Sequence, residues 1–206
     1  MKTENTPIEM YLKAMYELRQ RTVAVGLMCN NMYLVKKGGN VFDIENICLQ
    51  IRKLLELIAM SSLIMNKEAF EKAEKSFKTM WNAKLILKDI KRIHPQFFPM
   101  SISGTLSKNE NGSWVMDEIN HKPLTEETFC KIYDKCGAAL HIPNPFSENE
   151  NLFHELGEKI PMWLDQIYLT MENHMVFLYG TDLAYAIQFN GLDLDKNITY
   201  TLCKKK

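Results

Sequence analysis

The segment from Asp43 to Met65 constrains the fold more than any other part of the chain. Plotted at 100° per residue, it is predicted to be a long helix with one apolar arc, which holds Ile44, Ile47, Ile51, Leu54, Leu55, Ile58 and Ser62. Glu45, Arg52 and Glu56 line up beside this arc, and their stripe continues into Leu63. Charges at such a margin are costly unless they are paired. We therefore expect a helix inside a multi-helix core, with ion pairs along one edge.

The bulk composition indicates an ordinary globular chain. Its 206 residues, of which 46% are hydrophobic and 24% charged, are enough for one substantial core. Lys plus Arg and Asp plus Glu are both 25, so no global field attracts nucleic acid or an anionic membrane. No apolar run is long enough for a membrane helix, and the opening residues lack the apolar stretch of a signal peptide. Five irregularly spaced cysteines argue against a disulfide framework and predict a reduced, cytoplasmic protein.

Capping signals and helical periodicity predict five helices. They run from Thr6 to about Cys29, from Asp43 as the cap to Met65, from about Asn66 to Ile93, from Thr125 to near His141, and from a capping box at Ser147–Glu150 through Pro161. Arg19 falls in the middle of the apolar face of the first helix, which is unusual for a charge. A phase change near Asn82 indicates a kink or a new packing partner in the third helix.

The middle and the end of the chain alternate like strands. Two short strands flank the polar turn Asn109–Gly112, and the tail predicts strands at His174–Tyr179, Leu183–Phe189 and Asn197–Cys203. We therefore predict an α+β protein, mainly α, that forms a single domain over residues 1–206. Its five-helix bundle core would comprise residues 6–94 and 125–172, and its small antiparallel sheet would come from the middle segment, 98–119, and the C-terminal tail, 174–203.

The charged residues of the first two helices form the first candidate binding site. If these helices pack antiparallel, Arg19 reaches Glu45 or Glu56, and Arg52 pairs along its own helix with Glu56 one turn on. Such a cluster is either a preorganised pocket for a ligand or an RNA phosphate, or a salt-bridged network that fixes the register of the helices. Both interpretations stay open from the sequence.

A second candidate site ends the fourth helix. Lys135 stands six positions before His141, in the run Lys-Cys-Gly-Ala-Ala-Leu-His. This arrangement resembles the signature of the HEPN superfamily, an arginine followed by four to six residues and a histidine, and the helix from Arg52 to Glu56 is similar to one in some relatives. The resemblance implies a helical bundle with metal-independent ribonuclease activity in toxin–antitoxin or phage-defence systems. It would give His141 the catalytic histidine's role, Lys135 the arginine's role, and Glu56 and Arg52 the accessory pair.

The chain departs from that pattern, and a simpler interpretation exists. Lysine in place of arginine loses bidentate phosphate recognition, and Cys136 stands where active members carry a polar residue. Alternatively, His141 is a satisfied structural histidine, covered and hydrogen-bonded to the turn at Asn144, as the interaction-module interpretation expects. Three segments are also similar to uncharacterised bacterial helical proteins with no established activity, namely Leu49–Glu56, Trp81–Asp89 and Leu140–Pro145.

Other features narrow the choice of function. Lys84, Lys88, Lys91 and Arg92 form a basic patch suited to RNA or an acidic partner, although solvated helix faces look the same. The cysteines and histidines lack metal-ligand spacing, and no cofactor motif is present, so we predict neither metal nor cofactor. We expect a cytosolic helical binding or interaction module without independent catalysis, with a role in defence or a toxin–antitoxin system as one setting. Its expected partner is a protein or a second copy, and RNA or a small molecule stays open. The alternative is a HEPN-like metal-independent ribonuclease, or a degenerate relative, that uses His141 and nearby basic residues.

Overall fold

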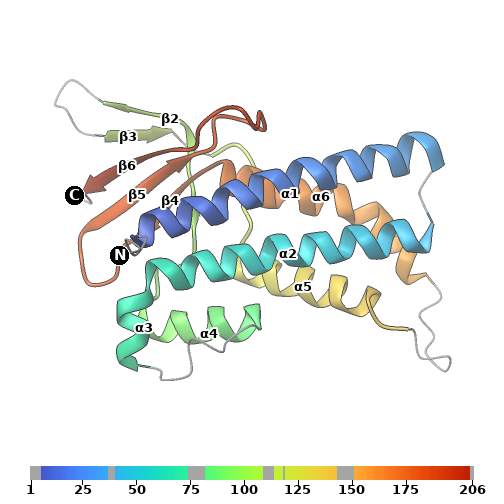
Figure 1. The fold of residues 1–206 in the computed structure, drawn as a ribbon, viewed down its shortest axis with the longest axis horizontal. Coiled ribbons are helices and arrows are strands. Elements are labelled where there is room, and N and C mark those ends of the chain that lie inside the picture. Colours follow the sequence, from blue (N-terminus) through green and yellow to red (C-terminus); the bar gives the residue numbers. More distant parts are fainter. Residues whose placement is uncertain are drawn as a thin grey trace, which may run out of the picture.

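Long helices run side by side along the molecule, and a small antiparallel sheet lies at one end of them (Figure 1). The computed structural model describes residues 6–36, 40–73, 82–108, 114–117, 119–142 and 151–204. The helices are α1 (Pro7–Lys36), α2 (Val41–Met65), α3 (Lys67–Ala73), α4 (Ala83–Ile93), α5 (Glu126–Ala139) and α6 (Leu152–Glu172). The strands are β1 (Met100–Ser101), β2 (Ser103–Lys108), β3 (Trp114–Asp117), β4 (Asn173–Phe177), β5 (Leu183–Gln188) and β6 (Thr199–Lys204). The predicted class, α+β and mainly α, is confirmed.

Helix α2 is the centre of the bundle and packs against α1, α4, α5 and α6. Every residue of its predicted apolar arc is buried, so the periodicity identified its packing face correctly. Its predicted cap was wrong. Asn40 is the N-cap, because its side-chain oxygen accepts a hydrogen bond from the Asp43 amide at 3.1 Å while the Asp43 carboxylate bonds back to the Asn40 amide. Asp43 is thus the third residue of the capping box rather than the cap.

Two other helix starts follow the predicted capping chemistry. Thr6 and Glu9 bond reciprocally at the start of α1, and Thr125 accepts from the Thr128 amide at the start of α5. The single helix predicted from Asn66 to Ile93 was wrong, because Asn82 caps a new helix, α4, by accepting from the amides of Lys84 and Leu85. The capping box predicted at Ser147–Glu150 lies outside the described residues, and α6 begins at Leu152.

The sheet has the order β1-β4-β5-β6, and β2 pairs with β3 in a separate ladder. The prediction that the middle segment joins the sheet was therefore right only for β1, which pairs with β4. One face of the sheet places Val176 and Ile187 in the main helical core. The other face forms a small second cluster with Ile102, Met175 and Ala186. Among the described helices, none has the length and apolar character that a bilayer crossing requires.

A fully buried histidine joins the sheet to α1. His174 of β4 donates from Nδ1 to the Met171 carbonyl at 2.8 Å, and its Nε2 accepts from the Tyr11 hydroxyl at 2.7 Å. Because the Met171 carbonyl can only accept, the neutral ring carries its hydrogen on Nδ1. Burial lowers the pKa of His174 from 6.5 to about 4 and raises the pKa of Tyr11.

The buried neutral His174 predicts a pH dependence of stability. Because the unfolded chain binds this proton near pH 6.5 and the folded chain only near 4, the free energy of unfolding falls as pH drops through that interval. The difference in pKa corresponds to about 3 kcal/mol. Chemical denaturation across this pH range measures the effect. The free energy of unfolding should fall by about 3 kcal/mol less in His174→Gln than in wild type. Exposed His154→Gln should retain the full drop, and an equal drop in all three proteins would contradict the assignment.

Candidate functional site

A shallow depression lies between α2 and the C-terminal end of α5. Its volume is about 360 Å³, and it is lined by Leu49, Arg52, Lys53, Glu56, Gly137, Leu140 and His141. Residues 85 positions apart in sequence meet here because α5 packs along α2. The depression therefore combines three nitrogen-bearing side chains, one carboxylate and two apolar residues in one small surface.

Arg52 is held firmly at the wall of this depression. Its guanidinium carbon lies 3.9 Å from the centre of the Tyr133 ring, and Nη2 donates to the Tyr133 hydroxyl at 2.7 Å. The same hydroxyl donates to Glu56 at 3.2 Å, and Arg52 and Glu56 form an ion pair at 3.8 Å. Burial raises the pKa of Tyr133, so its hydroxyl stays protonated and bridges the two charges. Arg52 is thus preorganised, with 23% of its side chain still exposed.

Gly137 creates the space that Arg52 occupies. A Cβ atom at Gly137 would lie 2.5 Å from Arg52 Nη1, which is too close for both atoms to stay where they are. Since the guanidinium is the end of a long side chain, it would move more easily than the backbone of α5. Glycine inside a helix costs stability relative to alanine. The glycine here therefore serves the placement of Arg52 rather than the helix.

Gly137→Ala should displace the Arg52 guanidinium from Tyr133 while leaving the fold intact. We expect the free energy of unfolding to change by less than about 1 kcal/mol, because the gain in helix propensity offsets the lost contacts. Nitrogen NMR relaxation of the Arg52 Nε–H group should report a more mobile side chain. Gly26→Ala is the matched control, since a Cβ there meets nothing within 4 Å. That variant should leave the Arg52 signal unchanged, and an unchanged signal in Gly137→Ala would contradict the account.

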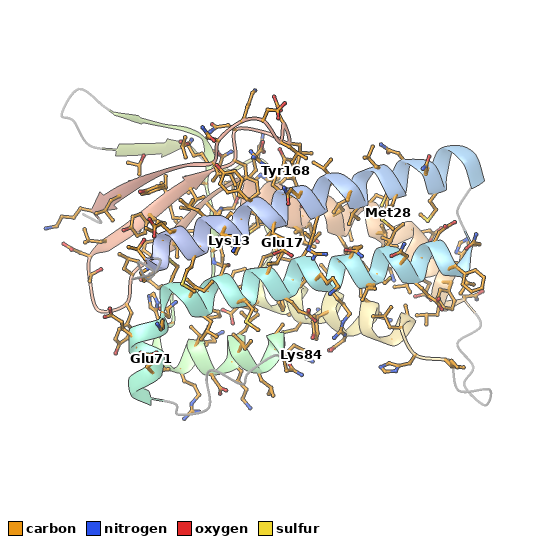
Figure 2. All side chains as sticks on the ribbon, in the orientation of Figure 1. Lys13, Glu17, Met28, Glu71, Lys84 and Tyr168 are labelled. Atoms are coloured by element: carbon orange, nitrogen blue, oxygen red, sulfur yellow. The ribbon has the colours of Figure 1, made fainter. Side chains whose placement is uncertain are left out.

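Apolar side chains stand exposed around the depression. Leu49 and Leu140, which line it, are 39% and 38% exposed, and Phe42 and Ile142 are 78% and 95% exposed. Phe42 lies two turns before Leu49 on the same side of α2. In the view of Figure 2, α2 runs between α1 and α5, and no other described helix or strand is drawn across its N-terminal half. An arginine flanked by exposed leucines is common at protein interfaces.

The structure separates the residues of the HEPN-like motif. His141 is exposed and lines the depression with Arg52 and Glu56. Lys135 is exposed on α5 and is not among the lining residues. The interpretation of His141 as a covered histidine is wrong, because its side chain is exposed. Asn144, its predicted partner, lies outside the described residues.

Arg19 does not join the charged cluster predicted for the first two helices. It is 1% exposed and donates to three main-chain carbonyls, those of Phe189 at 2.9 Å, Lys196 at 2.7 Å and Leu194 at 3.4 Å. The predicted contact with Glu45 or Glu56 was wrong because the guanidinium of Arg19 bonds to the connection between β5 and β6 instead of to α2. Glu45 is half-buried on α2 and forms no hydrogen bond or ion pair with the described residues.

The basic patch on α4 is largely paired with acidic side chains. Lys84 bonds to Asp134 at 2.7 Å, Lys91 pairs with Glu126 at 2.9 Å, and Arg92 lies 3.7 Å from Asp89 on its own helix. Figure 2 places Lys84 at the end of α4 nearest α5. The first two pairs connect α4 to α5, and this engagement of Lys84 and Lys91 leaves the patch a weak candidate for RNA binding.

The thiols are placed for packing rather than for reaction. Cys136 is fully buried beside Cys48, and a hydrogen bond with that thiol together with burial raises its pKa. A protonated, covered thiol is a poor nucleophile and a poor metal ligand. Within the described ranges, no group of three or more His, Cys, Asp or Glu side chains is arranged to hold a metal ion.

Sequence reasoning identified Arg52, Glu56 and His141 but missed the residues that organise them. Tyr133 and Gly137 lie one turn apart on α5, and both contact Arg52. A glycine inside an amphipathic helix is detectable in the sequence, and it indicates that a neighbouring group occupies the space where a side chain would stand. No family model, curated protein or solved structure matches the chain.

Proposed function

We propose that this protein is a helical interaction module without catalytic activity of its own, which binds a protein partner through the α2–α5 face. The α2–α5 face is the depression together with the exposed side chains of Phe42, Leu49, Leu140 and Ile142. The observation that carries the proposal is a preorganised arginine flanked by the exposed side chains of Leu49 and Leu140. Because Tyr133 and Glu56 fix Arg52 beforehand, little side-chain entropy is lost when a partner docks.

The chemistry of the depression favours binding over catalysis. Arg52 is already engaged by Tyr133 and Glu56, and Lys135, which the ribonuclease mechanism would need, is not among the lining residues. Lys53 and His141 offer further donors for a carboxylate or a main-chain carbonyl of the partner. A protein segment that carries both apolar and acidic groups fits this combination of neighbours.

Photo-crosslinking at paired positions tests the proposal. A photoreactive phenylalanine analogue is placed at Leu49 of the full chain, and in a second variant at Leu85, which is 54% exposed on α4. In the native host, the Leu49 variant should form a discrete protein adduct, and the Leu85 variant should not. Gly137→Ala in the Leu49 background should reduce the adduct, whereas Gly26→Ala should not. Equal adducts at both positions, or none at Leu49, would contradict the proposed binding face.

A HEPN-like ribonuclease, or its degenerate relative, is the second candidate function. It is favoured by one observation, that His141, Arg52 and Glu56 line the same depression. An exposed histidine beside an arginine can serve as general acid or base on a ribose hydroxyl. In this case purified wild type should cleave RNA without added metal, and His141→Ala should abolish cleavage while the melting temperature stays unchanged. Absence of cleavage by wild type leaves the interaction module as the better account.

A further inference from the structure

We infer that the partner bound by the α2–α5 face is a second copy of the same chain, with the two α2 helices packed antiparallel about Leu49. This inference rests on the proposed function, since it names the occupant of that face. The exposed stripe of α2 runs from Phe42 to Glu56, about 21 Å along the helix axis. A two-fold axis through its middle, at Leu49, would bury the apolar centre of each copy against the other.

The order of charges along the stripe determines the orientation. Glu45 lies one turn before Leu49, whereas Arg52 and Lys53 lie one turn after it. In an antiparallel pair, each position before Leu49 faces the position equally far after it on the other copy. Glu45 of each copy therefore lies opposite Arg52 and Lys53 of the other. A parallel pair would place Glu45 against Glu45, which is unfavourable.

The local environment leaves these groups available for pairing. Glu45 and Lys53 are both half-buried, and neither has a hydrogen-bond or ion-pair partner among the described residues. An interface that sets these charges against opposite ones gains attraction without breaking an ion pair that the described residues already form. The stripe also carries both signs, with Glu45 and Glu56 against Arg52 and Lys53, and so offers no net attraction to a polyanion such as RNA.

Apolar groups outside α2 enlarge the same interface. Leu140, which lines the depression with Arg52, is 38% exposed, and Ile142, two residues further along the chain, is 95% exposed. In the antiparallel pair, Arg52 of one copy approaches the half of the second α2 that carries Phe42. Each depression would thus be completed by the other copy, and two equivalent sites would flank the two-fold axis.

Sedimentation velocity of the full chain over a concentration series tests the inference. Wild type should show a monomer–dimer equilibrium, and Glu45→Lys should raise the dissociation constant at least tenfold by setting three cations against one another. Tagged Glu45→Lys should associate with Lys53→Glu more strongly than with itself. In the mixed pair, one half of the interface keeps the native pairing of Glu45 with Arg52 and Lys53, and in the other half the two substituted positions attract each other. The matched controls replace exposed side chains on other helices, Lys13→Glu on α1 and Leu85→Asp on α4. Both variants should dimerise like wild type.

Each outcome separates this inference from the proposed function. A wild type that stays monomeric, or a dimer that is indifferent to Glu45→Lys, overturns the antiparallel self-association. If the crosslinker at Leu49 then captures only a different protein, the α2–α5 face is still a binding face and only its occupant is wrong. If Leu49 captures nothing, both proposals fail. Recovery of association in the mixture of Glu45→Lys and Lys53→Glu supports the inference specifically.

Discussion

Replacing Arg19 by methionine is expected to lower the free energy of unfolding by on the order of 3 kcal/mol or more. The guanidinium is almost fully covered and donates to the carbonyls of Phe189, Leu194 and Lys196, all in the connection between β5 and β6. Methionine fills much of the volume but donates no hydrogen bond, so these acceptors lose their partner. The free energy of unfolding of Arg19→Lys should lie between those of wild type and Arg19→Met, since one ammonium group cannot reach all three carbonyls.

Chemical denaturation provides the measurement, and Arg21→Met provides the control. Arg21 lies two positions away on the same helix and pairs with Glu17 at 2.7 Å on the surface. Its replacement should cost no more than about 1 kcal/mol. Equal costs for the two substitutions would show that Arg19 does not hold the β5–β6 connection on α1.

Replacing Arg52 by methionine is expected to weaken partner binding by about thirtyfold, the factor that corresponds to a hot-spot loss of 2 kcal/mol. The substitution removes the fixed cation from the α2–α5 face, while the methionine side chain still packs on Tyr133. The change in stability should be near 1 kcal/mol, because Arg52 is partly exposed and makes few hydrogen bonds.

Lys135→Met is the matched control for Arg52→Met. Lys135 is an exposed cation on the neighbouring helix, and it does not line the depression. The interaction module predicts that this variant binds like wild type. The ribonuclease alternative predicts that loss of either cation impairs activity. A dissociation constant that changes equally in both variants would contradict the interaction module.

Local signals in the sequence predicted most of the fold. Each correctly predicted feature depends on residues that are close together in the sequence. These features are the apolar arc of α2, the caps at Thr6 and Thr125, and the three tail strands. The predictions that were wrong, the cap of α2 and the single helix from Asn66 to Ile93, concerned places where two local signals compete. Asn40 and Asp43 are both good caps, and α2 begins at the earlier of the two, with Asp43 as the third residue of its capping box. Asn82 looked like a change of packing phase but is the start of a helix.

Long-range partners were beyond the reach of the sequence. Arg19 was recognised as unusual, yet its acceptors are main-chain carbonyls about 170 residues later, which carry no side-chain signal. His174 was placed in a strand, but its bond to Tyr11 spans 163 positions. Arg52 and Glu56 were found together because they lie one turn apart, whereas Tyr133, which bridges them, belongs to another helix.

Cysteine accessibility is the most direct test of the claim that the α2–α5 face is covered by a partner. Four native cysteines are buried and Cys130 is half-buried, so a single introduced cysteine dominates labelling. Leu49→Cys and Leu85→Cys are labelled with a membrane-permeant maleimide, both in cells and as dilute purified proteins. The account predicts that Leu49→Cys is labelled several-fold more slowly in cells than in dilution, while Leu85→Cys is labelled equally in both. Equal labelling of Leu49→Cys in the two conditions would contradict it.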